Sequence, residues 1–278
     1  MGIKPVVVIY HGNCTDGFGA AYAAWFKFGN KAEYIEAHYG QPPPKVTGKE
    51  VYILDFSYKR DVLLAMHKEA KSLLVLDHHM TAKEDLDGLS FAVFDMNRSG
   101  CVMAWEHFHP ALAIPWGLKL IQDRDLWRFE MPYTKEFTAA IRAFVEPSFE
   151  AWDNVFADQN ESNKLVLRGR DLLKLEDKDI SFLAQRKHKV TLAGIEGIAC
   201  NAPSKYASEL GNRLAKESDT YAVIYSYDGY REEWQFSLRS VGDYDVTPIA
   251  KHYGGGGHKN ASGFATKTFI NLIQEDKE

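Results

Sequence analysis

The chain has 278 residues, of which 45% are hydrophobic, 13% aromatic and 26% charged. This composition is typical of a folded protein of one large domain or two ordinary ones. Its 33 Lys and Arg residues against 38 Asp and Glu residues give a formal net charge of −5, which excludes a broad basic surface, so a polyanionic partner would need a local basic site or bound metal ions.

The first residues and the cysteines indicate the cellular compartment. The longest apolar run near the start, Val6–Tyr10, is far shorter than a membrane span, and no signal-peptide pattern precedes it. Cys14, Cys101 and Cys200 are too few and too scattered for a disulfide framework or a structural zinc site. We therefore expect a cytoplasmic protein with reduced thiols and no membrane partner.

The first hundred residues alternate short apolar runs with helical patterns, which is typical of a sheet built from βαβ units. Helices are expected at Gly17–Phe28 and Tyr58–Ala70. The expected strands are Val6–Tyr10, Val51–Phe56, Leu73–Leu76 and Phe91–Phe94. The pattern predicts an α/β fold with a mostly parallel sheet.

From Ser99 onward the pattern is helical, and no strand is required before about residue 195. The expected helices are Ser99–His109, Ala111–Gln122, Lys135–Phe144 and Phe149–Phe156. The charged stretch Asn160–Val190 is interpreted as a helical linker, in which Arg186–Lys189 is a solvated helix face. We expect the tryptophans of these helical patterns to lie in the core, although one aromatic side chain could stack on a base; they are Trp25, Trp105, Trp116 and Trp127.

The last part of the chain predicts a second, smaller α/β domain. Its expected elements are strands Ile195–Asn201, Tyr221–Tyr227 and Trp234–Arg239, helices Ser204–Lys216 and Val246–Tyr253, and the glycine run Gly254–Gly257. The expected domains are residues 1–158, a helical linker at 159–192, and residues 193–278.

Acidic and imidazole side chains follow three successive predicted strands. His11, Asn13 and Asp16 come after the first strand, Asp55 ends the second, and Asp77-His78-His79 follows the third. In an open α/β sheet, ligands bind outside the carboxyl ends of the strands, so these loops should converge. Asp123 and Asp125, at the end of a predicted helix, are candidates to join them.

Carboxylates that converge in a partly buried site repel one another unless they take up protons or bind cations. Carboxylate oxygens with a minority of imidazoles suit Mn²⁺ or Mg²⁺. Two such ions would bridge and activate a water for attack on phosphorus and would stabilise the leaving oxygen. The sequence therefore predicts a two-metal site for phosphoester hydrolysis.

Five motifs in order carry a resemblance to a known family. They are His11-Gly-Asn-Cys-Thr-Asp16-Gly17, Leu54-Asp55, Asp77-His78-His79, Asp123, and Gly254–Gly257 followed by His258-Lys-Asn-Ala-Ser-Gly263. Together they resemble the DHH phosphoesterase family with its C-terminal DHH-associated domain, over nearly the whole chain. The resemblance implies a manganese-dependent phosphoesterase, of the kind that includes RecJ-like exonucleases, oligoribonucleases and cyclic-dinucleotide phosphodiesterases.

The resemblance also implies roles for individual residues. The implied metal ligands are His11, Asp16, Asp55, Asp77, His78 and Asp123, with Asp125 as the alternative to Asp123. Asp55 would bridge the ions, and Asp77, His78 and His79 would be catalytic, His79 by contacting the phosphoryl group or assisting the leaving oxygen. The first motif departs from the family's two aspartates, because Asn13 stands where an acidic ligand is expected; Asn is a plausible neutral oxygen ligand. Cys14 is expected to pack rather than to act as a nucleophile.

The second domain supplies the implied substrate contacts. The glycine run, including Gly255, Gly256 and Gly257, could present N–H donors as an anion-binding nest beside His258. Arg239, followed by Ser240, matches the strand that presents an arginine to the substrate phosphate in the family, and a guanidinium suits that bidentate contact. The active site is then expected in the cleft between the domains.

We therefore expect a metal-dependent phosphoesterase, with two Mn²⁺ ions or alternatively Mg²⁺, that hydrolyses the phosphodiester bonds of short oligonucleotides. A cyclic-dinucleotide phosphodiesterase, a phosphoadenosine phosphate phosphatase, a pyrophosphatase or polyphosphatase, and a non-catalytic nucleotide sensor stay open as alternatives. Substrate length, sugar type, direction of attack and a possible homodimer are not decided by the sequence.

Overall fold

The computed structural model describes residues 4–270, and these divide into two compact units. The division falls within a long helix, α8 (Gln159–Ala184), between Leu173 and Lys174. We call the parts before and after it the N-terminal and C-terminal units. The expected domain limits at 158/159 and 192/193 stay a prediction. No helix in the described part of the chain is both long enough and apolar enough to cross a membrane.

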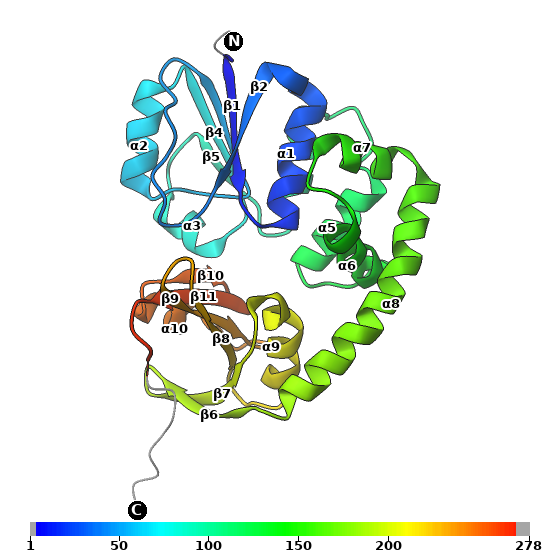
Figure 1. Ribbon diagram of the computed structural model, residues 1–278. Helices are drawn as coiled ribbons and strands as arrows, with labels where there is room; N and C mark the ends of the chain where they lie inside the picture. The colour runs from blue at the N-terminus through cyan, green and yellow to red at the C-terminus, as the bar shows by residue number, and fades with distance from the viewer. Residues whose placement is uncertain (1–3, 271–278) are drawn as a thin grey trace, which may run out of the picture. The chain divides into compact units, whose positions relative to one another are not determined.

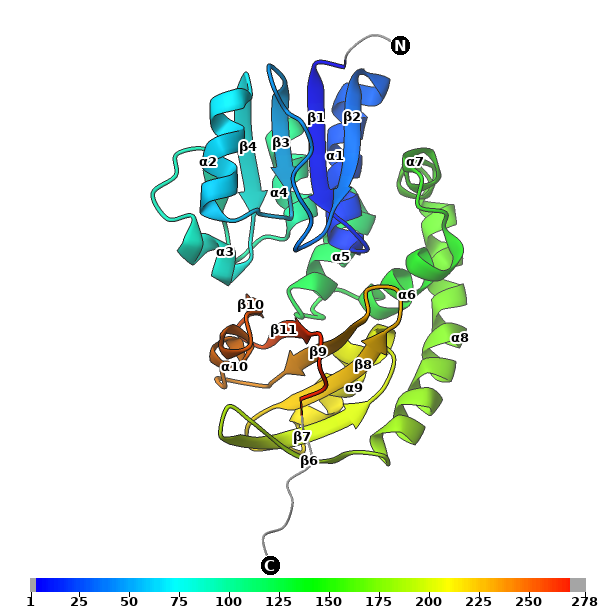
Figure 2. The same ribbon diagram turned by 60° about the vertical axis from the view of Figure 1, so that its left-hand side comes forward.

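The N-terminal unit is built on a parallel five-stranded sheet in the order β2-β1-β3-β4-β5 (Figures 1 and 2). The strands are β1 (Val6–His11), β2 (Ala32–Ala37), β3 (Glu50–Leu54), β4 (Ser72–Asp77) and β5 (Ala92–Phe94). The chain moves from β1 to β2 on one side and later to β3 on the other. The carboxyl ends of β1 and β3 are therefore the switch point at which open α/β sheets bind ligands.

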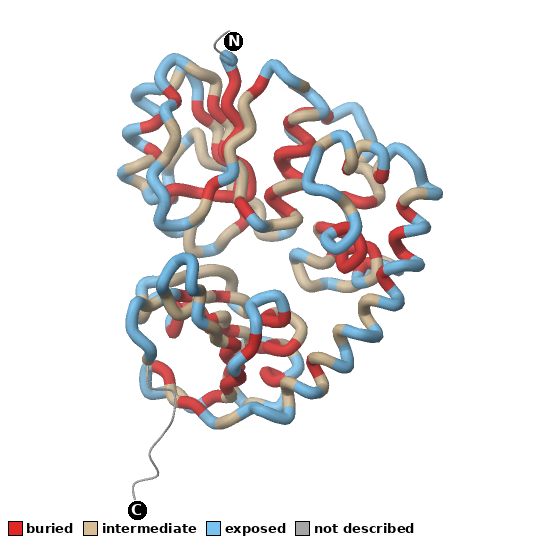
Figure 3. The backbone as a smooth tube through the Cα atoms, viewed as in Figure 1, coloured by how far each residue is buried: buried red, intermediate tan, exposed pale blue. Residues whose placement is uncertain are grey.

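Helices cover both faces of this sheet, which explains why its central strands are continuous apolar runs. The helices of this unit are α1 (Thr15–Phe28), η1 (Gly29–Lys31), α2 (Arg60–Glu69), α3 (Met80–Asp85), α4 (Gly100–Phe108), α5 (Trp116–Asp125), α6 (Thr134–Phe144), α7 (Phe149–Ala157) and the first part of α8. Alternate β1 residues point to opposite cores: Val8 packs with α1, α4 and α5, while Ile9 packs on the face that α2 covers. Figure 3 shows the resulting burial along β1 and α1.

The C-terminal unit is a six-stranded sheet in the order β10-β11-β9-β8-β7-β6. Its elements are β6 (His188–Leu192), β7 (Ile195–Asn201), η2 (Ser204–Tyr206), α9 (Ala207–Ala215), β8 (Ala222–Asp228), β9 (Glu233–Arg239), α10 (Thr247–His252), β10 (Gly256–His258) and β11 (Ala261–Thr266). β7 and β8 are parallel and the other pairs are antiparallel. α9 packs on one face, through Leu210, and α10 on the other, through Ile249.

Several strands were not expected from the sequence. β2 and β6 each pair on one side only, have two buried residues and carry charged residues, so they show no continuous apolar run. β11 was not expected either, although it lies between β10 and β9. The expectation that no strand lies between Ser99 and about residue 195 was wrong, since β6 begins at His188. Arg186–Lys189 is accordingly not a helix face: α8 ends at Ala184, and the run enters β6.

Two further boundaries were misplaced for identifiable reasons. The helix expected at Ala111–Gln122 begins at Trp116, because Pro115 is its N-cap residue and a proline disfavours helical backbone in the residue before it. The glycine run was expected to present its N–H groups as an anion-binding nest. Instead, Gly256 and Gly257 lie in β10, which pairs with β11.

A substitution at Gly169 tests how closely α8 packs against α6. A Cβ at this position would lie 2.0 Å from the backbone oxygen of Glu136. Replacing a helical glycine by alanine ordinarily adds about 1 kcal/mol of stability. Here the clash reverses the sign, and we expect Gly169→Ala to lower the free energy of unfolding by about 1–3 kcal/mol, measured by urea unfolding.

Asn163→Ala is the matched control, because Asn163 is exposed on the same helix. It should leave the free energy of unfolding unchanged or slightly higher. If Gly169→Ala behaves like this control, α6 and α8 do not approach each other at Gly169.

Candidate metal centre

The loops after β1, β3 and β4 place their polar side chains at the switch point of the N-terminal sheet. His11 ends β1, Asp55 follows β3 directly, and His78 follows the last residue of β4. Asp16 lies in the first turn of α1, and Asp125 is the last residue of α5. These five residues come from separate parts of the sequence and meet at one edge of the sheet.

Three carboxylates surround one ring nitrogen of His78. Its Nε2 lies 3.1 Å from Asp55 Oδ1, 3.4 Å from Asp125 Oδ2 and 3.7 Å from Asp16 Oδ2. Asp16, Asp55 and His78 are buried, whereas the Asp125 side chain keeps 27% of its accessible surface. The group is therefore embedded in the protein and reaches solvent at Asp125.

A second group lies on the other side of Asp55. His11, Asp55 and His79 each offer a ligand atom, and these atoms lie within 4.8 Å of one another. His11 Nδ1 is 3.6 Å from Asp55 Oδ2, and this buried nitrogen has no hydrogen-bond partner among the described residues. Asp55 thus faces both groups, with Oδ1 toward His78 and Oδ2 toward His11.

The crowding of carboxylates shifts their protonation. Burial, with the charges of Asp55 and Asp125, raises the pKa of Asp16 to about 8. Burial also raises the pKa of Asp125. Burial acts in the same direction on Asp55, but the imidazoles of His11 and His78 outweigh it and hold the pKa of this carboxyl well below its usual range. Burial lowers the pKa of His78, yet the carboxylates outweigh this effect and raise it to about 10.

Asp16 is held by the N-terminus of α4. Its carboxylate accepts hydrogen bonds from Ser99 Oγ (2.6 Å), the Gly100 N–H (2.6 Å) and the Cys101 N–H (3.1 Å). The same helix end also packs against Asp55, the residue that follows β3, because a Cβ on Gly100 would come within 2.4 Å of Asp55 Cβ. The first turn of α4 therefore fixes two carboxylates at once. Sequence reasoning did not identify Ser99 and Gly100 as part of the site.

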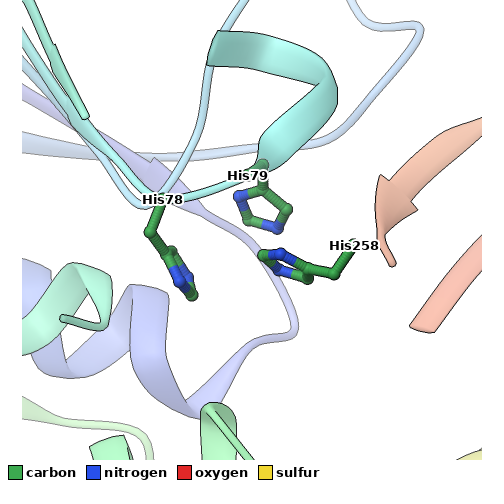
Figure 4. Close-up of side chains that lie close together, drawn as sticks. All are labelled: His78, His79 and His258. Atoms are coloured by element: carbon green, nitrogen blue, oxygen red, sulfur yellow. The ribbon is translucent and has the colours of Figure 1, made fainter. Parts of the chain in front are cut away.

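Both oxygens of the Asp77 carboxylate are engaged by neighbouring protein groups. Oδ2 accepts a hydrogen bond from Ser57 Oγ at 2.6 Å, and Oδ1 lies 2.7 Å from His79 Nδ1 and accepts from the His78 backbone N–H at 2.7 Å. Burial raises the pKa of Asp77, but the His79 imidazole outweighs it and lowers the value. Asp77 was expected to be a metal ligand, but its carboxylate instead bonds to Ser57, to the His78 backbone and to the imidazole of His79. Figure 4 shows the imidazoles of His78 and His79, whose ring centroids are 5.0 Å apart; His258, also labelled there, belongs to the C-terminal unit.

The structure separates the two candidate aspartates at the end of α5. The Asp123 carboxylate accepts hydrogen bonds from the backbone N–H groups of Glu130 (3.0 Å) and Met131 (3.2 Å) and from Thr134 Oγ1 (2.5 Å). It is buried and fixes the following loop. Asp125, two residues later, lies beside His78. Sequence reasoning carried Asp123 over from the family motif, whereas the geometry brings Asp125 to the group.

The first loop departs from the expectation at Asn13. Its backbone is left-handed, with φ of 55°, its side chain is exposed, and its N–H donates to Glu36. The structure does not bring it to the carboxylates. Cys14 lies next to it, with Sγ 3.5 Å from Asp55 Oδ2. Burial and the surrounding carboxylates raise the pKa of this thiol well above its usual value, which agrees with a cysteine that is not a nucleophile.

In the C-terminal unit, Arg239 and His258 share one face of the sheet. Ala261 of β11 is paired with Arg239 of β9 on one side and with His258 of β10 on the other, and side chains at paired positions point to the same face. Arg239 Nη2 donates to Ser208 Oγ. Ser240 is buried, and its Oγ donates to the Tyr244 carbonyl.

The glycine run forms a turn rather than an open nest. The N–H of Gly254 donates to the Lys251 carbonyl and that of Gly255 to the Ala250 carbonyl, both at the end of α10. Gly256 and Gly257 then pair with β11. A Cβ on Gly255 would lie 2.0 Å from the Gly263 oxygen. The run therefore connects α10 closely to an edge strand.

The donor set fits divalent cations. Carboxylate oxygens and imidazole nitrogens are the ligands of Mn²⁺ and Mg²⁺ sites, and no thiol joins either group among the described residues. The buried Nδ1 of His11 has no hydrogen-bond partner among residues 4–270, and positive charge would counter the burial and the neighbouring charges that raise the pKa of Asp16. Residues His11, Asp16, Asp55, His78, His79 and Asp125 could hold metal ions.

Comparison with known proteins identifies relatives of this chain. The DHHA1 domain model matches residues 189–277. The chain is 34% identical to an uncharacterized protein, R106, of Acanthamoeba polyphaga mimivirus, over 93% of this chain and 67% of that protein. It is 28% identical to the oligoribonuclease NrnB of Bacillus subtilis, over 92% of this chain and 71% of that protein.

The fold is likewise similar to a solved DHH domain from a protein described as a member of a family of ribosomal proteins. The TM-score is 0.62 at 13% identity, with 94% of this chain and 82% of that chain covered. The DHHA1 match and the likeness to the mimivirus and Bacillus proteins, together with the strand-end motifs, show the family. The chain belongs to the DHH phosphoesterase family, a family of metal-dependent hydrolases, and its C-terminal unit carries the DHHA1 domain.

Proposed function

We propose that this chain is a manganese-dependent phosphodiesterase that hydrolyses short oligonucleotides. The observation that carries the proposal is the approach of three carboxylates to His78 Nε2, at 3.1–3.7 Å. The substrate class is supported by the likeness to a protein named as an oligoribonuclease. A net charge of −5 supports short substrates, because long strands are usually held by broad basic surfaces.

We assign the metal ligands from the two groups that share Asp55. His11 and Asp55 would hold one ion, and Asp16, His78 and Asp125, again with Asp55, the other. Divalent ions at such a site polarise phosphoryl oxygens and lower the pKa of water near neutrality. Mn²⁺ is proposed over Mg²⁺ because imidazole nitrogen is a better ligand for the former. In this assignment Asp125 replaces Asp123, and neither Asn13 nor Asp77 is a ligand.

His79 is proposed as the group that protonates the leaving oxygen. Its Nδ1 lies 2.7 Å from Asp77 Oδ1, and Ser57 fixes the other oxygen of that carboxylate. Burial lowers the pKa of His79, but the charge of Asp77 outweighs this and raises it to about 9. A protonated His79, with Nδ1 directed to Asp77, can donate its second proton from Nε2. Asp77 then positions the acid.

The C-terminal unit is proposed to bind the substrate phosphate. Arg239 and His258 lie on one face of its sheet, on the two strands that flank β11, and both are paired with Ala261. A guanidinium and an imidazole on the same face suit the two oxygens of a phosphate. Ser240 and the glycines 255–257 are assigned to shaping this face, since the Ser240 hydroxyl and the N–H of Gly255 bond within the unit.

Activity on a panel of substrates tests the function. With Mn²⁺, we expect hydrolysis of dinucleotides and short oligonucleotides to exceed that of long strands, cyclic dinucleotides, phosphoadenosine phosphate and pyrophosphate. Asp55→Asn should lower kcat by at least about a hundredfold, because Asp55 faces both ligand groups. Asp61→Asn, at an exposed position of α2, is the control and should retain the full rate. A folded Asp55→Asn protein with an unchanged rate would refute the site.

A pair of variants tests the assignment of Asp125. Asp125→Asn should weaken Mn²⁺ binding at least about tenfold, with little change in stability, because its carboxylate faces the ligand group and solvent. Asp123→Asn should cost about 1–3 kcal/mol of stability, since it disrupts three hydrogen bonds in a buried site. Calorimetric titration with Mn²⁺ and urea unfolding measure both effects. The reverse pattern would make Asp123 the ligand.

The raised pKa of Asp16 predicts how the metal-free protein responds to pH. The folded carboxyl has a pKa of about 8, and an unfolded one titrates near ~4. Between these values the folded state binds the extra proton, so the stability that Asp16 contributes is greatest below about pH 4 and falls as pH rises toward 8. In EDTA, Tm measured by calorimetry should decrease from about pH 5 to about pH 8.

Saturating Mn²⁺ should shrink this decrease, because the cation stabilises the ionised carboxylate. Asp125→Asn should shrink it as well, in EDTA, because Asp125 is one of the charges that raise the pKa of Asp16. A Tm that rises with pH in EDTA, or that is indifferent to Mn²⁺, would contradict the crowded carboxylates.

A further inference from the structure

The loop that follows Asp125 carries aromatic residues in an unusual backbone conformation. Trp127, Phe129 and Tyr133 have φ values of 57°, 54° and 71°. Bulky residues seldom adopt this left-handed region, and such strain persists where the surrounding structure holds it, often at ligand sites. The loop begins at a residue that lies 3.4 Å from His78, so the strain lies next to the candidate metal centre.

Asp123 holds the loop in this conformation. Its carboxylate accepts from the N–H groups of Glu130 and Met131, and its backbone carbonyl accepts from those of Arg128 (2.9 Å) and Phe129 (3.4 Å). Met131 packs against the main core of the unit. The positions of the aromatic rings are thus set by buried contacts, and ordering them would cost little when a ligand binds.

The two central rings are paired with cations rather than packed in the interior. The Trp127 and Phe129 ring centroids are 4.9 Å apart, edge to face. The Arg124 guanidinium lies 5.1 Å from the Trp127 centroid, and Lys135 Nζ lies 4.6 Å from that of Phe129. Both rings are half-buried, and neither belongs to a hydrophobic core cluster of the described residues.

Trp127 was expected to lie in the core with the other three tryptophans, and for Trp127 this expectation was wrong. Trp105 is buried in the main core, and Trp25 and Trp116 pack against it. A tryptophan in a helical pattern is usually a core residue, and that holds for these three. Trp127 instead follows the end of α5, outside the helix.

We propose that Trp127 and Phe129 form a stacking surface for a nucleobase of the substrate, next to the scissile phosphate. The inference rests on the proposed function and names the part of the substrate that this loop contacts. Every base has a π-face, so aromatic side chains bind bases with little sequence preference. Arg124 and Lys135 add positive charge beside the rings, which suits the phosphates that flank a base.

A comparison of two substrates tests this surface. One is a dinucleotide, and the other is the same dinucleotide lacking both bases, each assayed with Mn²⁺. The wild type should prefer the substrate with bases. Trp127→Leu and Phe129→Leu should lower the ratio of the two kcat/KM values at least about fivefold, chiefly through KM. Trp127→Phe and Phe129→Tyr keep a ring and should largely restore the ratio.

Tyr230→Leu is the matched control, because Tyr230 is 96% exposed in the C-terminal unit. It should leave the ratio unchanged. Circular dichroism melting verifies that each variant is folded. A ratio that does not change in the Leu variants overturns the stacking surface, as does an equal loss on both substrates, which would mean that the loop acts only by shaping the metal centre.

Failure of the proposed function is distinguishable from failure of this inference. If the wild type hydrolyses neither substrate, the proposed activity falls. Stacking is then tested by equilibrium dialysis of the intact dinucleotide in EDTA, with wild type and Phe129→Leu. Weaker binding by the variant supports the surface without catalysis, and equal binding overturns it.

Discussion

The approach of three carboxylates to one imidazole is the constraint on which the site depends. Asp16, Asp55 and Asp125 lie 3.1–3.7 Å from His78 Nε2, and burial together with the neighbouring carboxylates raises the pKa values of Asp16 and Asp125. The fold supports this concentration of charge with hydrogen bonds from a helix N-terminus and with imidazoles on both sides of Asp55. The site still requires positive charge, which agrees with membership of a family of metal-dependent hydrolases.

The central architecture could be predicted because its physical signal is local. Strands β1, β3 and β4 are buried on both faces, so they are continuous apolar runs. The residues that follow them must then meet at one edge of the sheet. The edge strands β2 and β6 gave no such signal, because each has only two buried residues and carries charged residues.

The finer details of the site depend on tertiary contacts that no local pattern encodes. Asp123 and Asp125 are two residues apart, and the hydrogen bonds of the following loop decide which one turns toward His78. The Asp-His-His triplet is similar: its three neighbours in sequence have three different surroundings. Asp77 is enclosed by Ser57 and His79, and this arrangement appears only when β3 and β4 lie side by side.

The close contact between Gly100 and Asp55 has a consequence for how this branch of the family can diverge. A single methyl group at position 100 would strike the carboxylate shared by both ligand groups, and the same turn of helix caps Asp16. The packing therefore excludes a larger side chain at position 100. The exposed side chain of Asn13 is not packed in this way, so a substitution there would leave both ligand groups in place.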